Sequence, residues 1–262
     1  MSHPSHVLVV EDSRVQAKII SQHITETTPF QTLVTHTLAE TRAAMMEHRG
    51  AIFVAILDRN LPDDPDGEIV PLANSLGIPS VVMTASFSEE VRQQLLAHNV
   101  VDYFIKSMAG VTAMERLIER LYKNLSVRAL VADDSRLFRH RLMGLLHNLN
   151  IQSAEAEDGR QALEMLTADP SIRLLITDYN MPRLDGFELI ESIRTSRPKD
   201  SLAIVGVSGE NGGHIAKFLK IGANDFIVKP VQVEEFTCRV NQQLDMLDII
   251  EDYKRMCEQA SA

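Results

Sequence analysis

The sequence predicts two tandem α/β domains, each a doubly wound, five-stranded parallel sheet, followed by an extended C-terminal helix. Two observations support this fold class. Short apolar runs rich in β-branched residues alternate with segments of helical period, and the whole series occurs twice in the 262 residues. A chain of this length can form two domains of ordinary size. We expect the first domain over residues 1–125, the second over 127–245, and a helical extension over 246–262.

The repeat consists of four motifs that keep their order. "HVLVVEDSRVQAKII" at 6–20 returns as "RALVADDSRLFRHRL" at 128–142, and "AIFVAILD" at 51–58 returns as "IRLLITD" at 172–178. The other two pairs are "IPSVVMTA" with "LAIVGVSG" and "NVVDYFIKS" with "GANDFIVKP". Because four motifs recur at nearly the same spacing, we interpret the chain as two copies of one domain.

The second copy shows the helical pattern clearly. Helices are expected at approximately 136–149, 159–168, 186–196, 212–221 and from 232 onward. Ser135 can cap the first of these helices, and Gly222 fits the end of the fourth. Right-handed crossovers between the strands then give an α/β sandwich of about 120 residues for each copy.

The last helix is longer than a closing helix needs to be. "VEEFTCRVNQQLDMLDIIEDYKRMCEQA" keeps helical character for 28 residues, which is about twice the usual length. Its first turns would place Phe236, Val240 and Leu244 against the domain. Four later residues follow a 3-4-3 spacing: Met246, Ile249, Tyr253 and Met256. This spacing predicts a seam with another helix, and hence a homodimer, with a solvent-facing tail as the alternative.

Composition excludes several classes of function. The formal net charge is −10 with no polybasic block, which argues against direct binding of nucleic acid. The longest apolar runs are too short to span a membrane, and the first residues lack the pattern of a secretion signal, so we expect a cytoplasmic protein. Neither the two cysteines nor the scattered histidines have the spacing of a metal site or a disulfide framework.

The repeated motifs place chemical groups at one edge of each predicted sheet, because the carboxyl ends of parallel strands converge there. The second copy contributes Asp133, Asp134, Asp178, Ser208 and Lys229. The first copy contributes Glu11, Asp12, Asp58, Thr84 and Lys106. Each edge therefore carries three carboxylates, one hydroxyl and one ammonium.

Three neighbouring carboxylates repel one another unless a cation joins them. Oxygen ligands alone favour Mg²⁺, which also accepts phosphate oxygens. With the charge neutralised, one carboxylate can attack phosphorus while the ammonium stabilises the oxygens of the transferred group. The pattern thus predicts a magnesium site that forms an aspartyl phosphate.

With these motifs, each copy resembles the receiver domain of two-component response regulators, a flavodoxin-like fold also called CheY-like. The resemblance covers nearly all of residues 5–245. For the second copy it implies that Asp178 is the phosphoacceptor. It assigns the metal to Asp133, Asp134, Asp178 and the backbone carbonyl of Asn180, the phosphoryl group to Ser208 and Lys229, and an aromatic switch to Phe226.

The same resemblance assigns the first copy residue by residue. Asp58 would be the phosphoacceptor, with the metal on Glu11, Asp12, Asp58 and Asn60, the phosphoryl group on Thr84 and Lys106, and the switch on Tyr103. This copy departs from the family pattern in two places. Ser107 stands where a proline usually follows the lysine, and the loop "RNLPDDPDGE" carries extra acids. A scaffold role without phosphorylation therefore remains an alternative for the first copy.

The resemblance also implies partners. A sensor histidine kinase, a phosphotransfer protein or a small phosphodonor such as acetyl phosphate would supply the phosphoryl group. Two receivers followed by a long helix are similar to the front of diguanylate cyclases, which make cyclic di-GMP. These residues contain no conventional enzyme site beyond self-phosphorylation on aspartate. A stand-alone adaptor that binds a partner is the alternative.

Two other classes with related folds fit less well. A haloacid-dehalogenase-like phosphatase needs a second acid two residues after the nucleophile, where this chain has Asn180 and Asn60. A flavodoxin-like redox protein needs a phosphate cradle after the first strand, where this chain has the acidic "EDSRVQ" and "DDSRLF". Acids at that position would repel the phosphate of FMN.

Overall fold

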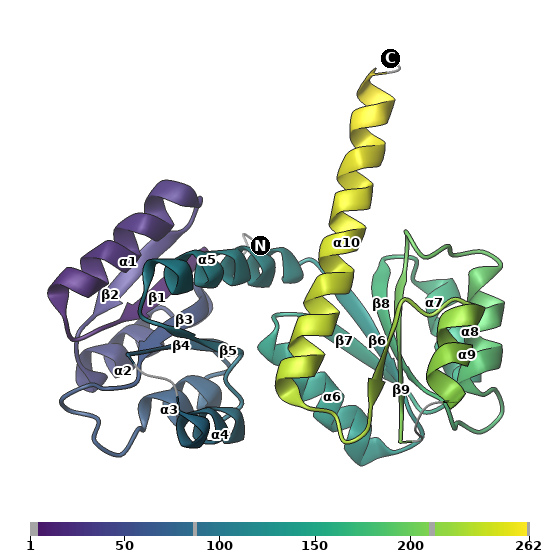
Figure 1. The fold of residues 1–262 in the computed structure, drawn as a ribbon, viewed down its shortest axis with the longest axis horizontal. Coiled ribbons are helices and arrows are strands. Elements are labelled where there is room, and N and C mark those ends of the chain that lie inside the picture. The colour runs from purple at the N-terminus through teal and green to yellow at the C-terminus, as the bar shows by residue number, and fades with distance from the viewer. Residues whose placement is uncertain (1–4, 86–87, 210–212, 261–262) are drawn as a thin grey trace. The chain divides into compact units, whose positions relative to one another are not determined.

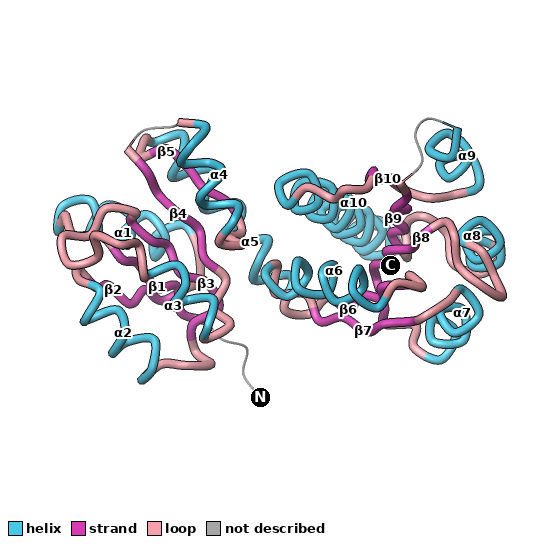
Figure 2. The backbone as a smooth tube through the Cα atoms, turned by 90° about the horizontal axis from the view of Figure 1, so that it is seen from below, coloured by secondary structure: helices cyan, strands magenta, loops and turns pink. Residues whose placement is uncertain are grey.

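The computed structural model describes residues 5–85, 88–209 and 213–260. The chain divides into two compact units: a first unit of residues 1–125 with 148–150, and a second unit of residues 126–147 with 151–262. Each unit contains one five-stranded parallel sheet with helices on both faces (Figures 1 and 2). The predicted fold class is therefore confirmed.

In the first unit the strands lie in the order β2-β1-β3-β4-β5. Helices α1 and α5 cover one face of this sheet, and α2, α3 and α4 cover the other (Figure 1). The elements are β1 His6–Val10, α1 Arg14–Thr27, β2 Gln31–Thr35, α2 Leu38–Glu47, β3 Ile52–Asp58, α3 Ile69–Ser75, β4 Ser80–Thr84, α4 Glu89–Ala97, β5 Asp102–Ile105 and α5 Met108–Asn124.

The second unit repeats this topology with the strand order β10-β9-β8-β6-β7. Helices α6 and α10 lie on one face and α7, α8 and α9 on the other (Figure 2). The elements are β6 Arg128–Ala132, α6 Arg136–Asn148, β7 Gln152–Ala156, α7 Gly159–Ala168, β8 Ile172–Asp178, α8 Gly186–Arg194, β9 Ala203–Ser208, α9 Gly213–Ile221, β10 Asp225–Val228 and α10 Val233–Ala260.

Strand register brings the ends of the central strands to one level. In the first unit Val10 of β1 pairs with Leu57 of β3, and Asp58 pairs with Met83 of β4. The next residues along β1 and β4 are Glu11 and Thr84, so both lie at the same edge as Asp58. In the second unit the corresponding pairs are Ala132 with Thr177 and Asp178 with Val207. The buried apolar runs thus fix where the polar residues emerge.

Local signals fix the helix ends as the sequence predicts. The Ser135 hydroxyl accepts a hydrogen bond from the backbone N–H of Phe138 at 3.4 Å, at the start of α6. Gly222 follows α9 with a φ of +123°, a conformation that favours glycine. Of the predicted helix over 212–221, residue 212 lies outside the described residues. Helix α8 begins with a capping box between Asp185 and Glu188.

Helix α10 is a single helix of 28 residues that extends beyond the sheet of its own unit (Figure 1). Its first half packs on the unit through Phe236, Val240 and Leu244, all buried as predicted. The burial continues to Leu247, and Asp248 then forms an ion pair at 3.0 Å with Arg173 at the start of β8. The helix is therefore held against the unit for about half of its length or more.

No helix in the described part of the chain is long and apolar enough to cross a membrane. Both cysteines, Cys238 and Cys257, are exposed, and neither forms a disulfide.

Gly206 lies in β9 beneath two aromatic rings. An added Cβ would lie 2.7 Å from Cδ1 of Phe218 and 2.9 Å from Cδ2 of Phe226. Gly206→Ala is expected to lower the free energy of unfolding by about 1–3 kcal/mol, because the rings must leave their packed positions. Urea unfolding measures this change. Gly209→Ala is the matched control, since no atom of the described residues lies within 4 Å of its added Cβ, and an equal loss in the two variants would contradict the packing argument.

Candidate functional site

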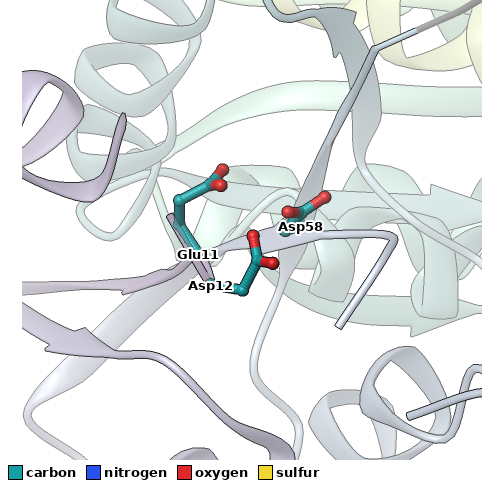
Figure 3. Close-up of side chains that lie close together, drawn as sticks. All are labelled: Glu11, Asp12 and Asp58. Carbon is teal, nitrogen blue, oxygen red and sulfur yellow. The ribbon is translucent and has the colours of Figure 1, made fainter. Parts of the chain in front are cut away.

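The edge of the first sheet holds a close group of acids. Oxygens of Glu11, Asp12 and Asp58 all lie within 4.8 Å of one another (Figure 3). Glu11 and Asp58 are 1% and 2% exposed, whereas Asp12 is exposed to solvent. Among the residues that the structure describes, this is the only group of three or more potential metal ligands placed so closely.

Lys106 bridges two of these carboxylates. Its Nζ lies 2.7 Å from Oε2 of Glu11 and 2.7 Å from Oδ2 of Asp58. Backbone N–H groups complete the arrangement, because Ser13 donates to Glu11 at 3.3 Å and Asn60 donates to Asp58 at 3.1 Å. The carboxylates are thus fixed by one ammonium and two main-chain donors.

Burial shapes the ionisation of this edge. It raises the pKa of Glu11 above its ordinary value and outweighs the hydrogen bond from Lys106, which lowers it. Burial by itself would lower the pKa of Lys106, but its hydrogen bonds to Asp58 and Glu11, together with the attraction of their charges, raise that pKa by more. The lysine is therefore a fixed cation, and Glu11 is an acid whose ionised form is disfavoured.

The second sheet carries the same ion-pair geometry. Nζ of Lys229 lies 2.9 Å from Oδ2 of Asp133 and 2.9 Å from Oδ1 of Asp178. Asn180 donates its backbone N–H to Asp178 at 3.1 Å, and Ser135 donates to Asp133 at 2.8 Å. Four of the contacts that organise the first edge therefore recur at the second.

The acceptor position of the second edge is also buried. Asp178 is 7% exposed, and burial raises its pKa more than the hydrogen bond from Lys229 lowers it. The pKa of Lys229 is raised, as is that of Lys106, because its hydrogen bonds to Asp178 and Asp133 and the attraction of their charges together outweigh the lowering by burial. Asp134 is exposed.

The predicted phosphate-binding hydroxyls lie at the same edges. Ser208 and Thr84 are each 2% exposed at the ends of β9 and β4. The backbone N–H of Lys229 donates to the Ser208 carbonyl at 2.9 Å, and that of Lys106 donates to Thr84 at 2.8 Å. Each hydroxyl residue is thus joined through the main chain to the lysine that contacts the acceptor.

The predicted switch aromatics have different surroundings. Phe226 is 4% exposed, and its ring centroid lies 5.2 Å from that of Phe218. Tyr103 is half-buried and packs against the apolar core of the first unit. Both residues lie on the strand that leads to the site lysine, three residues before it.

The two departures of the first copy have local structural roles. The Ser107 hydroxyl accepts a hydrogen bond from the backbone N–H of Gly110 at 3.1 Å and caps α5, whereas the second unit has a cis peptide between Lys229 and Pro230. The extra acids bind helix starts: Asp64 accepts from the backbone N–H groups of Glu68 and Ile69, where α3 begins, at 2.6 and 3.0 Å. Asp63 accepts from the first residues of α2 at 2.9 and 3.3 Å.

Sequence reasoning missed one contact of the site. Nζ of Lys229 lies 4.0 Å from the ring centroid of Phe138, a cation–π contact from the first turn of α6. The position follows the acid pair in "DDSRLF", where the first copy has Gln16 in "EDSRVQ". The difference between these two stretches was the available sequence signal.

The residues of the first edge fit a divalent cation, because its three carboxylates lie within 4.8 Å of one another, whereas Asp133, Asp134 and Asp178 of the second edge are not gathered so closely. Three carboxylates and one ammonium leave two uncompensated negative charges at the first edge when all the acids are ionised. Burial already disfavours the ionised forms of Glu11 and Asp178, and an added cation would offset that effect. The donor set consists of carboxylate oxygens and no sulfur, which favours a hard ion.

Comparison with known proteins agrees with this geometry. Residues 129–241 match the response regulator receiver domain. The two-component response regulator ORR11 of Oryza sativa subsp. indica is 36% identical over 104 residues, which are 39% of this chain and 71% of that protein. A chemotaxis protein CheY homolog of Campylobacter jejuni subsp. jejuni (strain 81-176) is 36% identical over 106 residues, which are 40% of this chain and 82% of that protein.

A solved structure resembles both units together. It is described as a two-component system response regulator/GGDEF domain protein, and it is 38% identical with a TM-score of 0.80. The similarity covers 93% of this chain and 99% of that one. The chain belongs to the response regulator receiver family of two-component signalling. Its particular form is a pair of tandem receiver folds followed by a long C-terminal helix.

Proposed function

We propose that the chain is a magnesium-dependent phosphoacceptor that takes phosphate on Asp178 and on Asp58. The observation that carries this proposal is the doubled arrangement of a buried acceptor carboxylate, a second buried acid and a bridging lysine, with N–O distances of 2.7 to 2.9 Å. One such group could be an ordinary buried ion pair. Its recurrence at the same strand ends of both sheets favours a shared chemical role.

The proposed reaction is a phosphoryl transfer. An oxygen of the Asp178 carboxylate forms a bond to phosphorus while the bond to the donor, P–N in a phosphohistidine or P–O in acetyl phosphate, breaks. The electron pair of the broken bond leaves with the donor group. Lys229 lies 2.9 Å from the acceptor carboxylate and can follow the transferred oxygens with its charge. The buried hydroxyl of Ser208 is available to the same group.

A magnesium ion would bind next to the acceptor. In the first unit the ligands would be Glu11, Asp12, Asp58 and the Asn60 carbonyl, and in the second unit Asp133, Asp134, Asp178 and the Asn180 carbonyl. When bound, the ion neutralises the carboxylates and stabilises negative charge on the phosphoryl oxygens. The exposed positions of Asp12 and Asp134 suit ligands at the solvent side of such a site.

Phosphorylation would be coupled to the aromatic residues of β5 and β10. Phe226 contacts Phe218 of α9, so its movement would reach that helix and α10, which follows β10 directly. In the first unit, Tyr103 would act on α4 and α5 in the same way. A sensor histidine kinase or phosphotransfer protein in the cytoplasm, or a small phosphodonor, would supply the phosphoryl group, as is usual for this family.

The far half of α10 supports a proposal of dimerisation. Met246, Ile249, Tyr253 and Met256 are 53%, 63%, 64% and 61% exposed. At about 100° per residue, these four side chains lie on the side of the helix opposite to Leu247, Asp248 and Glu251. That second side is occupied by the unit itself, since Arg173 pairs with Asp248 and with Glu251 at 3.0 and 3.4 Å. We therefore assign the apolar side to a second copy of the chain.

A double substitution tests the dimer. Ile249→Glu with Tyr253→Glu is expected to convert a dimer to a monomer and so halve the mass measured by light scattering, because four like charges would face one another across the seam. Arg255→Glu on the occupied side of the helix is the control and should leave the mass unchanged. A wild-type mass of one chain at every concentration would contradict the proposal.

The output we propose is cyclic di-GMP synthesis by a catalytic domain that follows α10 in the whole protein. The similarity to the response regulator/GGDEF domain protein, which extends over 93% of this chain, supports this output. A dimer formed through α10 would bring two such domains together. The alternative is an adaptor that binds a partner directly, with the first unit as a scaffold. The length of the native protein distinguishes the two.

Labelling tests the central proposal. The chain is incubated with Mg²⁺ and acetyl phosphate, and the phosphoryl groups are counted by intact-mass spectrometry. Two groups are expected on the wild type and none on the Asp58→Asn, Asp178→Asn double variant. Full labelling of the double variant would overturn the assignment of both acceptors.

A further inference from the structure

The first unit contains a cavity of about 630 Å³ beside its acceptor. It lies between the loop after β3, the first turn of α3 and the C-terminal end of α4. Its walls include Asp58, Leu61, Ile69, Val70, Val82 and Leu95. The volume falls within the range of small-molecule sites, roughly 300–1,000 Å³.

The second unit shows what fills the same place in the other copy. Leu95 stands eleven residues before Lys106, and Phe218 stands eleven residues before Lys229. In the same way, Arg59 directly follows one acceptor and Tyr179 follows the other. The first unit therefore has a smaller or more polar side chain at each of these positions.

A third position also differs between the copies, at Glu68, which lies outside the cavity lining. Glu68 comes after "DG" in the loop of the first unit, and Phe187 comes after "DG" in the second. Phe187 lies 4.8 Å from Tyr179 and 4.7 Å from Phe218, measured between ring centroids. Three packed rings thus occupy the region between α8, α9 and the loop after β8. In the first unit, Glu68 is instead exposed and pairs with Arg42 at 3.4 Å.

We propose that the cavity of the first unit binds a small planar aromatic molecule, which takes the place of the rings that the second unit supplies itself. The floor is apolar, since Val82, Ile69 and Leu95 are 1%, 1% and 5% exposed. Arg59 lines the cavity and is half-buried, with its Nη2 donating to Gln94 of α4 at 2.9 Å. A guanidinium held in this way offers a planar surface on which an aromatic ring can stack.

This binding goes beyond the proposed phosphoacceptor function and does not depend on it. Asp58 forms part of the cavity wall, so a bound ring would lie next to the acceptor of the first unit. In the described part of the second unit, the rings of Tyr179, Phe187 and Phe218 are in contact with one another. The two copies would then differ in that only the first responds to a ligand.

Methyl NMR of the whole chain tests the site directly, with indole as the probe and no phosphodonor present. Indole titration is expected to give saturable shifts for the methyl groups of Ile69, Val70, Val82 and Leu95. Methyl groups of the second unit should stay unchanged. No shift up to the solubility limit of indole, or shifts spread over both units, would overturn the proposal.

Two filling variants locate the binding. Leu95→Phe and Arg59→Tyr each copy the residue of the second unit at a position that lines the cavity, and each is expected to weaken indole binding at least 10-fold by occupying it. Arg59 is half-buried at the cavity wall, so the second variant keeps the test valid if the first does not fold. Leu137→Phe is the matched control, at a residue that is 84% exposed in the second unit, and it should leave the affinity unchanged. Unchanged affinity in both filling variants would place indole elsewhere and refute the assignment.

Discussion

Asp178→Asn is expected to abolish phosphorylation of the second unit, with a loss of label at that site of at least about 100-fold. Asparagine keeps the shape of the side chain but has no carboxylate to bond to phosphorus. Asp178 is the only carboxylate that β8 places at this edge among the described residues.

Peptide mapping after labelling measures this loss at the level of each unit. Asp58→Asn is the matched control, since it should remove the label of the first unit and leave that of the second. Retention of label in the peptide that contains residue 178 would mean that another group accepts phosphate there. A loss of both labels from either single variant would show instead that the two sites depend on each other.

Lys229→Met is expected to slow phosphorylation of Asp178 by about 100- to 1,000-fold, the usual effect of removing one donor that stabilises charge in a transition state. The ammonium contacts both buried acids at 2.9 Å, and methionine has similar length without the charge. Magnesium uptake should persist, because the acids remain. The measurement is the rate of label incorporation at saturating Mg²⁺.

The repeat supplies the control for this variant too. Lys106→Met should slow labelling of Asp58 alone, since that lysine pairs only with acids of its own unit in the described structure. An unchanged rate at Asp178 in Lys229→Met would limit the lysine to a structural ion pair. A simultaneous loss of folded protein, measured by thermal unfolding, would show that the ion pair is needed for stability.

Much of the fold and of both edges could be predicted because few physical constraints determine them. Buried runs such as "IFVAIL" and "RLLIT", repeated between helical segments, are typical of central parallel strands, and such strands align their carboxyl ends. The polar residue that ends each run is then fixed in place. Asp58 and Asp178 follow from this rule, as do Thr84 and Ser208. The bounds of α10 follow from its uninterrupted helical period.

Other features depend on side-chain geometry that the sequence pattern does not encode. The extra acids of the loop "RNLPDDPDGE" suggested a scaffold role for the first copy. In the structure, Asp63 and Asp64 each accept two hydrogen bonds at the start of a helix. To predict such a cap, one must know which helix end lies nearby in space. The contact between Phe138 and Lys229 could not be predicted for the same reason, since the two residues are about 90 positions apart in the sequence.

The cavity could not be predicted for a similar reason. Residues 59 and 95 line it, and their differences from the second copy look unrelated in sequence. Their common effect is visible only when the equivalent rings of Tyr179 and Phe218, packed with Phe187, are seen in contact. Because the chain contains two copies of one domain, each position of the first unit can be compared with its equivalent in the second.

Magnesium calorimetry tests most directly the claim that each sheet edge is an acidic site built for a divalent cation. Saturable uptake at two sites is expected, with one site lost in Asp12→Asn and the other in Asp134→Asn. Because burial raises the pKa of Glu11 and of Asp178, protons compete with the ion, and uptake should weaken as the pH falls through those raised values. Folded protein that takes up no magnesium at neutral pH would contradict the account at both edges.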